Sequence, residues 1–301
     1  MSDPELWDLP DVDVSWAAAR VGDEEFVGHR ARALVAPASV VKVQVALTVA
    51  SAFETGVLDA TSRVRLGADV RTPGPVGMSL MDDPVEMSLR DLLVSMMTIS
   101  DNVATDALLR AEGLRAVNDT TAQLGLGDTF VASGLRALLD GMAHEAGFGD
   151  YALMAAHDHR IAGPPTDDEV RARLAGCSAL DPERGSRTTP ADMVLLLSLV
   201  WTDRAGPPPG CARVRSLMGR QLTRSRIASG FGTKTAVAAK SGGLMGVVRN
   251  EVGVVSDPGE PAVAVAVFTR REPGSPAEPA EIDAAIGRLA RRAVDRVRSR
   301  G

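Results

Sequence analysis

Apolar and polar residues alternate near both ends of the chain. In residues 12–21 every second position from Val12 to Ala18 is apolar, the period of a half-buried strand. A second short strand at about 25–30 would pair with it across the turn 21–23. Strand patterns return near the C-terminus, at about 237–241, 244–256 and 261–269. The sequence therefore predicts strands from both ends of the chain.

Between these strands the spacing of apolar residues predicts helices. Residues 39–55 are apolar nearly all round and stop at Gly56, which indicates a deeply buried helix. Leucines and methionines three and four positions apart, from Leu89 to Met97, predict an amphipathic helix, and another begins just after Asn102. Further helices are expected from Thr189, from about 211 to Thr223, and at the C-terminus, where Ile282, Ile286, Leu289 and Ala293 share one face.

This order of elements favours one sheet built from both termini, with helices inserted between its halves. We expect residues 1–37 and 212–301 to form a discontinuous α/β domain, and residues 38–211 to form a helical domain. A chain of 301 residues is long enough for one large domain or two closely packed ones.

The composition is that of an ordinary globular protein, with 45% hydrophobic and 24% charged residues. A net charge of −6 and an aromatic content of 3% argue against nucleic-acid binding. The first ten residues lack the pattern of a secretory signal, and the richest apolar run, 40–53, is too short and too interrupted to span a membrane. We expect a cytoplasmic monomer that acts on a small molecule, without a membrane or nucleic-acid partner.

The cysteines and histidines suggest no metal chemistry. Cys177 and Cys211 are expected to be free thiols, because disulfides are rare inside the cell. Three histidines, His144, His157 and His159, lie in one segment but lack a further ligand at a defined spacing. We therefore expect no metal and no cofactor.

One serine and one lysine stand three positions apart at the start of the first predicted helix. Lysine occurs only at positions 42, 234 and 240, and Lys42 follows Ser39 at i+3, on the same helix face. A buried lysine can lose its proton and activate a serine hydroxyl, and the helix N-terminus favours the negative charge that develops there. Alone, the pair also fits a helix-start serine beside a lysine that reaches the surface.

Two further short motifs follow. Ser100-Asp101-Asn102 lies at the break between two predicted helices, and Lys240-Ser241-Gly242 lies at the end of a predicted strand. Each is expected by chance only about 0.02 times in such a chain. Separately, the two motifs could be a helix-start turn and an edge-strand lysine. Finding all three motifs by chance in this order is far less probable than finding any one of them.

The set S-x-x-K, S-D-N and K-S-G resembles the class A serine β-lactamases and the wider penicillin-recognising serine hydrolases. Ser39 and Ser100 are 61 positions apart, which fits that family, and the stretches KSGGLMGVVRNEVGVV and TTPADM are similar to it as well. The resemblance covers about three quarters of the chain. It implies a mixed α/β fold: an antiparallel sheet flanked by helices, with an all-helical domain.

The resemblance also implies roles for individual residues. Ser39 would be the acylated nucleophile, Lys42 its proton partner and Ser100 the relay to the leaving group. Asn102 would bind the amide side chain of the substrate, and a substrate carboxylate would be bound by Lys240, Ser241 and Gly242. Arg249 would be a second cation for this carboxylate. The backbone N–H groups of Gly243 and Ser39 would form the oxyanion hole. Arg249 fits a solvated strand charge equally well.

The sequence departs from the class A pattern at the deacylating base. No E-x-x-L-N motif occurs between Asn102 and Thr188, and the interval from Ser100 to Lys240, 140 positions, is longer than in that family by about 35. The carboxylates in this region are Glu145, Asp150, Asp158 and Glu183, each of which is more simply a surface acid.

These observations predict a serine hydrolase of the class A β-lactamase type. It would act through an acyl-enzyme on a β-lactam or a related amide or ester that bears a carboxylate. A D,D-peptidase, an esterase or an acyl-transfer tailoring enzyme on the same fold is the first alternative. The second is a β-lactam-binding protein that does not hydrolyse its ligand.

Overall fold

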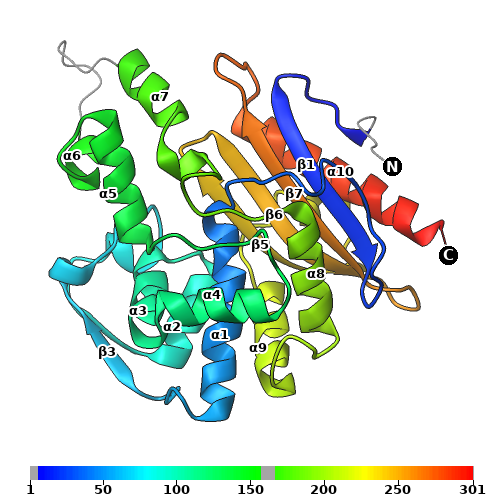
Figure 1. Ribbon diagram of the computed structural model, residues 1–301, viewed down its shortest axis with the longest axis horizontal. Coiled ribbons are helices and arrows are strands. Elements are labelled where there is room, and N and C mark those ends of the chain that lie inside the picture. Colours follow the sequence, from blue (N-terminus) through cyan, green and yellow to red (C-terminus); the bar gives the residue numbers. More distant parts are fainter. Residues whose placement is uncertain (1–5, 157–166, 301) are drawn as a thin grey trace.

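Strands from both ends of the chain form one antiparallel sheet in the computed structural model, which describes residues 6–156 and 167–300 (Figure 1). The strand order is β2-β1-β7-β6-β5. The strands are β1 (Val12–Arg20), β2 (Val27–His29), β5 (Ala236–Leu244), β6 (Val248–Ser256) and β7 (Val263–Arg271). β1 pairs with β7 along its whole length, so the N-terminal strand lies inside the C-terminal sheet. This confirms the predicted single sheet.

One strand boundary differs from the prediction. The pattern 244–256 belongs to two strands, because the chain turns between β5 and β6, where Met245 and Gly246 have φ angles of 50° and 70°. β5 therefore continues through the K-S-G motif to Leu244 rather than ending at it.

The two faces of the sheet bury different helices. Alternate residues of β1, such as Val14 and Trp16, pack against α10 (Pro279–Arg298), whose predicted apolar face is buried. The intervening Ala17 and Ala19 face the core that contains α8 (Pro190–Trp201). Figure 1 shows α8 and α10 on opposite sides of the sheet. Successive residues of β1 thus pack into two different cores, because helices cover both faces of the sheet.

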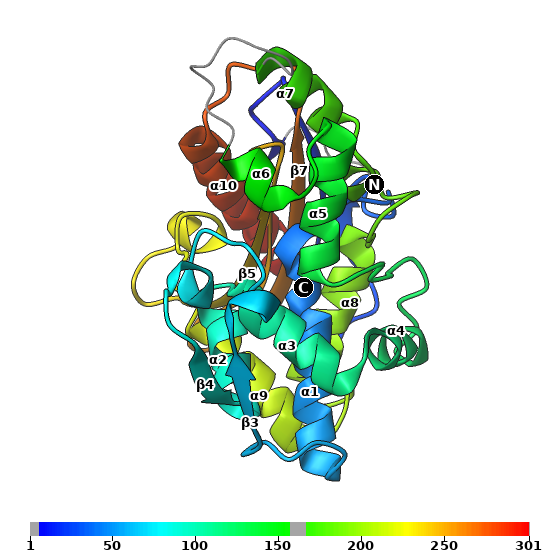
Figure 2. The same ribbon diagram turned by 90° about the vertical axis from the view of Figure 1, so that its left-hand side faces the viewer.

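The first predicted helix begins with a tighter turn than expected. Ala38–Val41 form a 3-10 turn, η2, and the α-helix α1 runs over Lys42–Thr55, so Ser39 precedes the α-helix proper. Every residue of α1 from 42 to 50 is buried, and Gly56 ends the helix in the left-handed conformation, as predicted. α1 contacts α2, α3, α4 and α9 and runs through the middle of the helical layer (Figure 2).

The remaining elements lie between β2 and β5 along the chain. The helices are α2 (Leu89–Thr98), α3 (Asn102–Glu112), α4 (Leu114–Gln123), α5 (Leu135–Ala146), α6 (Tyr151–Ala155), α7 (Asp167–Ala175) and α9 (Pro208–Gly219). Four short 3-10 turns are η3 (Ala68–Val70), η4 (Gly77–Leu80), η5 (Ser178–Leu180) and η6 (Ile227–Gly230). The strands β3 (Arg63–Leu66) and β4 (Val85–Ser88) form a small hairpin that the sequence analysis missed.

The ends of two helices test the capping signals. Thr189 caps α8 and accepts a hydrogen bond from the Asp192 N–H, as the sequence indicates. α9 ends at Gly219 rather than Thr223.

α8 lies in the segment assigned to the helical domain but packs on β1 and β7. The division into residues 1–37 with 212–301 and residues 38–211 stays a prediction. In the part of the chain that the structure describes, no helix is both long and apolar enough to cross a membrane.

Candidate active site

Ser39 lies in η2, at the edge of a cavity of about 190 Å³. Asn102 of the second motif and Gly243, which directly follows the third motif, line the same cavity. Ala38, directly before the serine, has a left-handed backbone (φ 50°), which is uncommon for alanine and marks a constrained turn. Ser39 is therefore presented by a constrained turn directly before the buried helix α1.

Lys42 is fully buried beside this cavity. Its Nζ donates hydrogen bonds to the Ser100 carbonyl (2.6 Å), Asn102 Oδ1 (2.9 Å) and Ser100 Oγ (3.2 Å). Burial lowers the pKa of Lys42 to about 7, although the charges of Asp101 and Asp106 oppose this effect. A lysine with that pKa can take up a proton near neutral pH. Among the described residues its Nζ bonds to Ser100 and Asn102, and no bond to the Ser39 hydroxyl occurs.

Ser100 connects the first and third motifs through hydrogen bonds. Its hydroxyl receives hydrogen bonds from Lys42 Nζ (3.2 Å) and from Lys240 Nζ (3.0 Å). Two ammonium groups on one oxygen would repel each other, and burial together with the charge of Lys42 lowers the pKa of Lys240. Ser100 itself has a left-handed backbone (φ 63°). The structure thus brings Ser100 and both lysines together, as the motifs require.

Asp101 explains why the second motif stands between two helices. Its buried carboxylate caps α3 by accepting from the Ala104 N–H (3.1 Å), and it also accepts from Ser95 Oγ and the Met78 N–H (both 2.9 Å). Asn102 then starts α3 with its side chain fixed between Lys42 and the Pro73 carbonyl, to which Nδ2 donates (2.9 Å). One amide hydrogen of Asn102 stays available for a ligand.

Gly242 allows β5 to approach the Ser39 turn closely. A Cβ at this position would lie 2.7 Å from the Pro37 carbonyl oxygen, 3.1 Å from the Val40 nitrogen and 3.2 Å from the Ser39 nitrogen. These neighbours are backbone atoms, which cannot rotate away. The glycine therefore sets the distance between the third motif and Ser39.

Replacing Gly242 with alanine should lower both stability and acylation at Ser39. The added methyl group must push β5 away from η2, and overpacking of this kind costs about 1–3 kcal/mol. Gly219→Ala is the matched control, because a Cβ at Gly219 meets no atom within 4 Å. Thermal unfolding and the rate of labelling by benzylpenicillin measure the two effects. Unchanged labelling in Gly242→Ala would contradict this role.

Gly243 presents its backbone toward the cavity. The Ser241 N–H donates across the free edge of β5 to Gln221 Oε1 (2.5 Å). Because N–H groups of alternate residues point to the same side of an antiparallel strand, the N–H of Gly243 also points to this edge. That orientation suits the predicted oxyanion hole.

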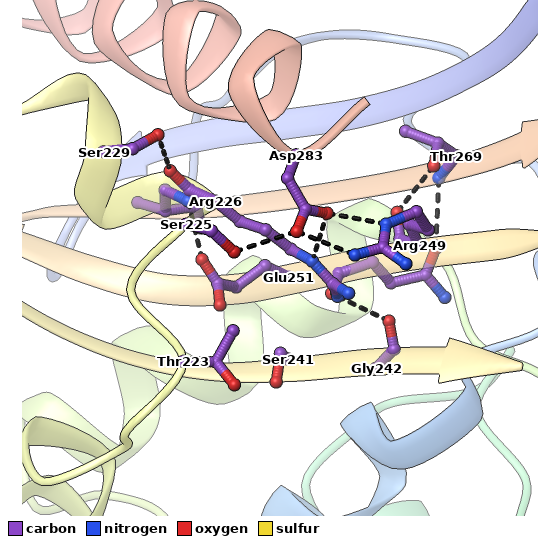
Figure 3. Close-up of polar contacts among 12 residues, drawn as sticks. Thr223, Ser225, Arg226, Ser229, Ser241, Gly242, Arg249, Glu251, Thr269 and Asp283 are labelled. Carbon is purple, nitrogen blue, oxygen red and sulfur yellow. Dashed lines mark hydrogen bonds and ion pairs between the residues drawn. The ribbon is translucent and has the colours of Figure 1, made fainter. Parts of the chain in front are cut away.

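Arg249 does not line the cavity but forms an ion-pair cluster with two other residues (Figure 3). Its guanidinium makes two hydrogen bonds of 2.7 Å to Asp283, which also accepts from Arg226 Nε (2.8 Å). Burial opposes ionisation of Asp283, but the bond from Arg249 and the charge of Arg226 hold its pKa below the usual value. The reading of Arg249 as a solvated strand charge is wrong, since its side chain is only 21% exposed. Its role toward a substrate carboxylate stays a prediction.

The sequence analysis missed the polar residues that support the K-S-G segment. Arg226 Nη1 donates to the carbonyls of Gly242 (2.6 Å) and Asn250 (2.5 Å), as Figure 3 shows for Gly242. Gln221, which holds Ser241, donates in turn to Glu251 (3.0 Å). Burial raises the pKa of Glu251. No spacing signal could identify these residues, because their partners are 16 to 57 positions away.

Of the carboxylates considered as deacylating base, the three in the described chain, Glu145, Asp150 and Glu183, do not line the cavity with Ser39. Glu145 accepts from Ser178 and pairs with Arg184, and Asp150 caps α6. Glu183 is exposed, and Asp158 lies outside the described residues. Over residues 6–156 and 167–300, the cavity lining includes no Asp, Glu or His.

The remaining candidates show no metal-binding arrangement. The ring of His144 bonds to the Gly149 carbonyl, while His157 and His159 fall outside the described residues. Within the described part of the chain, no group of three His, Cys, Asp or Glu side chains is placed to hold a metal ion. Cys177 and Cys211 are buried free thiols, and burial raises the pKa of both.

Comparisons with known proteins agree with this fold. The model of the "Beta-lactamase enzyme family" matches residues 9–297. A β-lactamase from Sphaerobacter thermophilus superposes with a TM-score of 0.72 at 26% identity, covering 95% of this chain and 92% of the other. One from Xanthomonas campestris gives a TM-score of 0.74 at 17% identity, with coverage of 95% and 91%. At that identity the likeness concerns the fold alone.

A curated relative is similar over most of its length. The "Beta-lactamase regulatory protein BlaB" of Streptomyces cacaoi is 30% identical over 273 residues, which cover 87% of this chain and 85% of the relative. The matched range extends over nearly the whole chain, from before β1 to the last turn of α10, and contains the positions of all three motifs. The chain therefore belongs to the beta-lactamase enzyme family.

Proposed function

We propose that the protein forms an acyl-enzyme at Ser39 with a β-lactam, or with a related amide or ester that bears a carboxylate. The observation that carries this proposal is the convergence of Lys42 and Lys240 on the Ser100 hydroxyl, beside a cavity lined by Ser39 and Asn102. A weak nucleophile needs a nearby group that accepts its proton, and a lysine with a pKa of about 7 meets this need.

Each residue then has a chemical task. Ser39 Oγ attacks the carbonyl carbon as Lys42 takes its proton, and the N–H groups of Ser39 and Gly243 stabilise the oxyanion. The C–N or C–O bond then breaks, and Ser100 gives a proton to the leaving atom. Lys42 or Lys240, both hydrogen-bonded to Ser100, replaces that proton.

Recognition of the substrate falls to residues around this centre. Asn102 would hold the amide side chain through its free hydrogen. Lys240 and Ser241, together with Gly242, would bind the carboxylate. Arg249 could assist only if its guanidinium, which is bound to Asp283, also contacted the substrate carboxylate.

The absence of a carboxylate from the described cavity lining favours a second candidate, a β-lactam-binding protein that is acylated but scarcely hydrolyses its ligand. A relative named as a regulatory protein supports the same candidate. A D,D-peptidase, an esterase or an acyl-transfer enzyme would use the same acylation step but pass the acyl group to another nucleophile or accept a more reactive ester.

The acyl-enzyme should therefore accumulate. General-base catalysis contributes about 10²–10⁴-fold, so hydrolysis without it is slow. About one β-lactam ring per enzyme is then opened in a burst, and the ring-opened molecule, with its leaving nitrogen, stays bound to Ser39. Intact-protein mass measured over time after addition of benzylpenicillin tests this expectation. A persistent adduct indicates a trap, whereas burst-free turnover at about 1–10³ s⁻¹ would show that a deacylating base is present. No adduct and no turnover would point to another substrate.

A further inference from the structure

Part of the cavity wall is apolar. Leu135, Leu138 and Leu139 of α5 line it together with Tyr151 of α6, and Leu244 lines it from the end of β5. None of the described lining residues carries a charged side chain. A ligand group that enters this space therefore meets hydrocarbon in the same cavity that Ser39 lines.

The apolar wall is anchored to α3, the helix that begins at Asn102. Asp106 of α3 accepts hydrogen bonds from the N–H groups of Leu135 (2.7 Å) and Arg136 (2.8 Å), which are the first two residues of α5. The same carboxylate accepts from Thr72 Oγ1 (2.6 Å), next to the residue that binds Asn102. α5 and the Asn102 side chain are thus fixed by one hydrogen-bonded framework, which preforms the cavity.

The position of the cavity identifies which part of a substrate would enter it. Asn102, the candidate for binding the amide side chain, lines the cavity, whereas Lys240 and Arg249, the candidates for the carboxylate, do not. The cavity therefore lies on the acyl side of the bond that Ser39 attacks. The group bound to the acyl carbon would be placed against α5.

We propose that α5 and Tyr151 form a specificity wall that selects substrates with a neutral, apolar or aromatic acyl substituent. This inference rests on the proposed function and adds the substrate class to it. A charged substituent would lose its hydration in the cavity and meet no counter-charge among the described lining residues, so a substrate that carries it would acylate Ser39 more slowly.

A matched series of penicillins tests the wall in the unmodified protein. Benzylpenicillin and its α-carboxy and α-amino derivatives share one ring system and differ only in the charge on the acyl substituent. We expect acylation of Ser39, followed by intact mass, to be on the order of 10²-fold faster for benzylpenicillin than for either charged derivative. Equal rates for the three compounds would overturn the specificity wall.

Two substitutions of opposite charge at one position provide the second test. Leu138→Lys should favour the α-carboxy compound, and Leu138→Glu the α-amino compound, so that the ratio of their rates differs at least tenfold between the variants. Because both variants lose the same leucine, a general loss of packing affects them alike. Leu153→Lys and Leu153→Glu are the controls, since Leu153 is 59% exposed and does not line the cavity. An unchanged ratio in the Leu138 pair contradicts the proposal.

A fluorophosphonate probe separates failure of the wall from failure of the proposed function. Labelling of Ser39 by this probe or by any penicillin, without discrimination among the three side chains, would overturn the wall alone. If neither the probe nor any of the penicillins reacts at Ser39, the proposed function fails and the specificity wall fails with it.

Discussion

Replacing Ser39 with alanine should abolish covalent labelling by benzylpenicillin and by a fluorophosphonate. Only a hydroxyl group can form the ester bond. Among the serines of the described chain, Ser39 alone both lines this cavity and precedes α1, whose first residue is Lys42. The fold should survive, because the turn that contains Ser39 has no side-chain cap hydrogen bond. Intact mass measures labelling, and thermal unfolding checks the fold.

The matched control for this experiment is Ser51→Ala, a serine near the C-terminal end of α1 that does not line the cavity. This variant should be labelled at the rate of the unmodified protein. Alanine favours helix, so little change in stability is expected. If Ser39→Ala is still labelled while its fold is intact, the nucleophile is another residue and the proposed mechanism is wrong.

Lys42→Arg should reduce acylation by about 10²–10⁴-fold, the usual contribution of a general base. Guanidinium remains protonated at all accessible pH values and cannot accept the serine proton. In the unmodified protein the rate should rise with pH through about 7, because burial lowers the pKa of Lys42 to that value and the neutral amine is the active form. Below this pH the lysine is protonated and acylation is lost.

Lys234→Arg is the control for this change, because Lys234 is exposed and lies outside all three motifs. Its acylation rate and its pH profile should match those of the unmodified protein. Stopped-flow or mass measurements from pH 5 to pH 9 decide the question. A flat profile, or a normal rate in Lys42→Arg, would remove the general-base role from Lys42.

The local pattern of the chain was sufficient to predict most of the elements and their order. Apolar positions with period 2 gave the strands of both termini, and positions three and four apart gave the helices, because burial of one face imposes the period of the backbone on the sequence. The capping signal at Thr189 was equally local. The short motifs also identified Lys42, Ser100 and Lys240, which the fold joins by hydrogen bonds.

Only the tertiary structure decided what surrounds these residues. Asp283 lies 34 positions from Arg249 and 57 from Arg226, and a pairing over such distances leaves no periodic trace in the sequence. The hydrophobic pattern of α5 predicts that one face is covered, but not that Leu138 faces a cavity shared with Ser39. Likewise, four carboxylates between Asn102 and Thr188 were equal candidates for the deacylating base by sequence. Packing alone determines that Glu145 and Asp150 accept other hydrogen bonds. Local periodicity records which face of an element is buried, whereas the partners of that face depend on how distant segments pack.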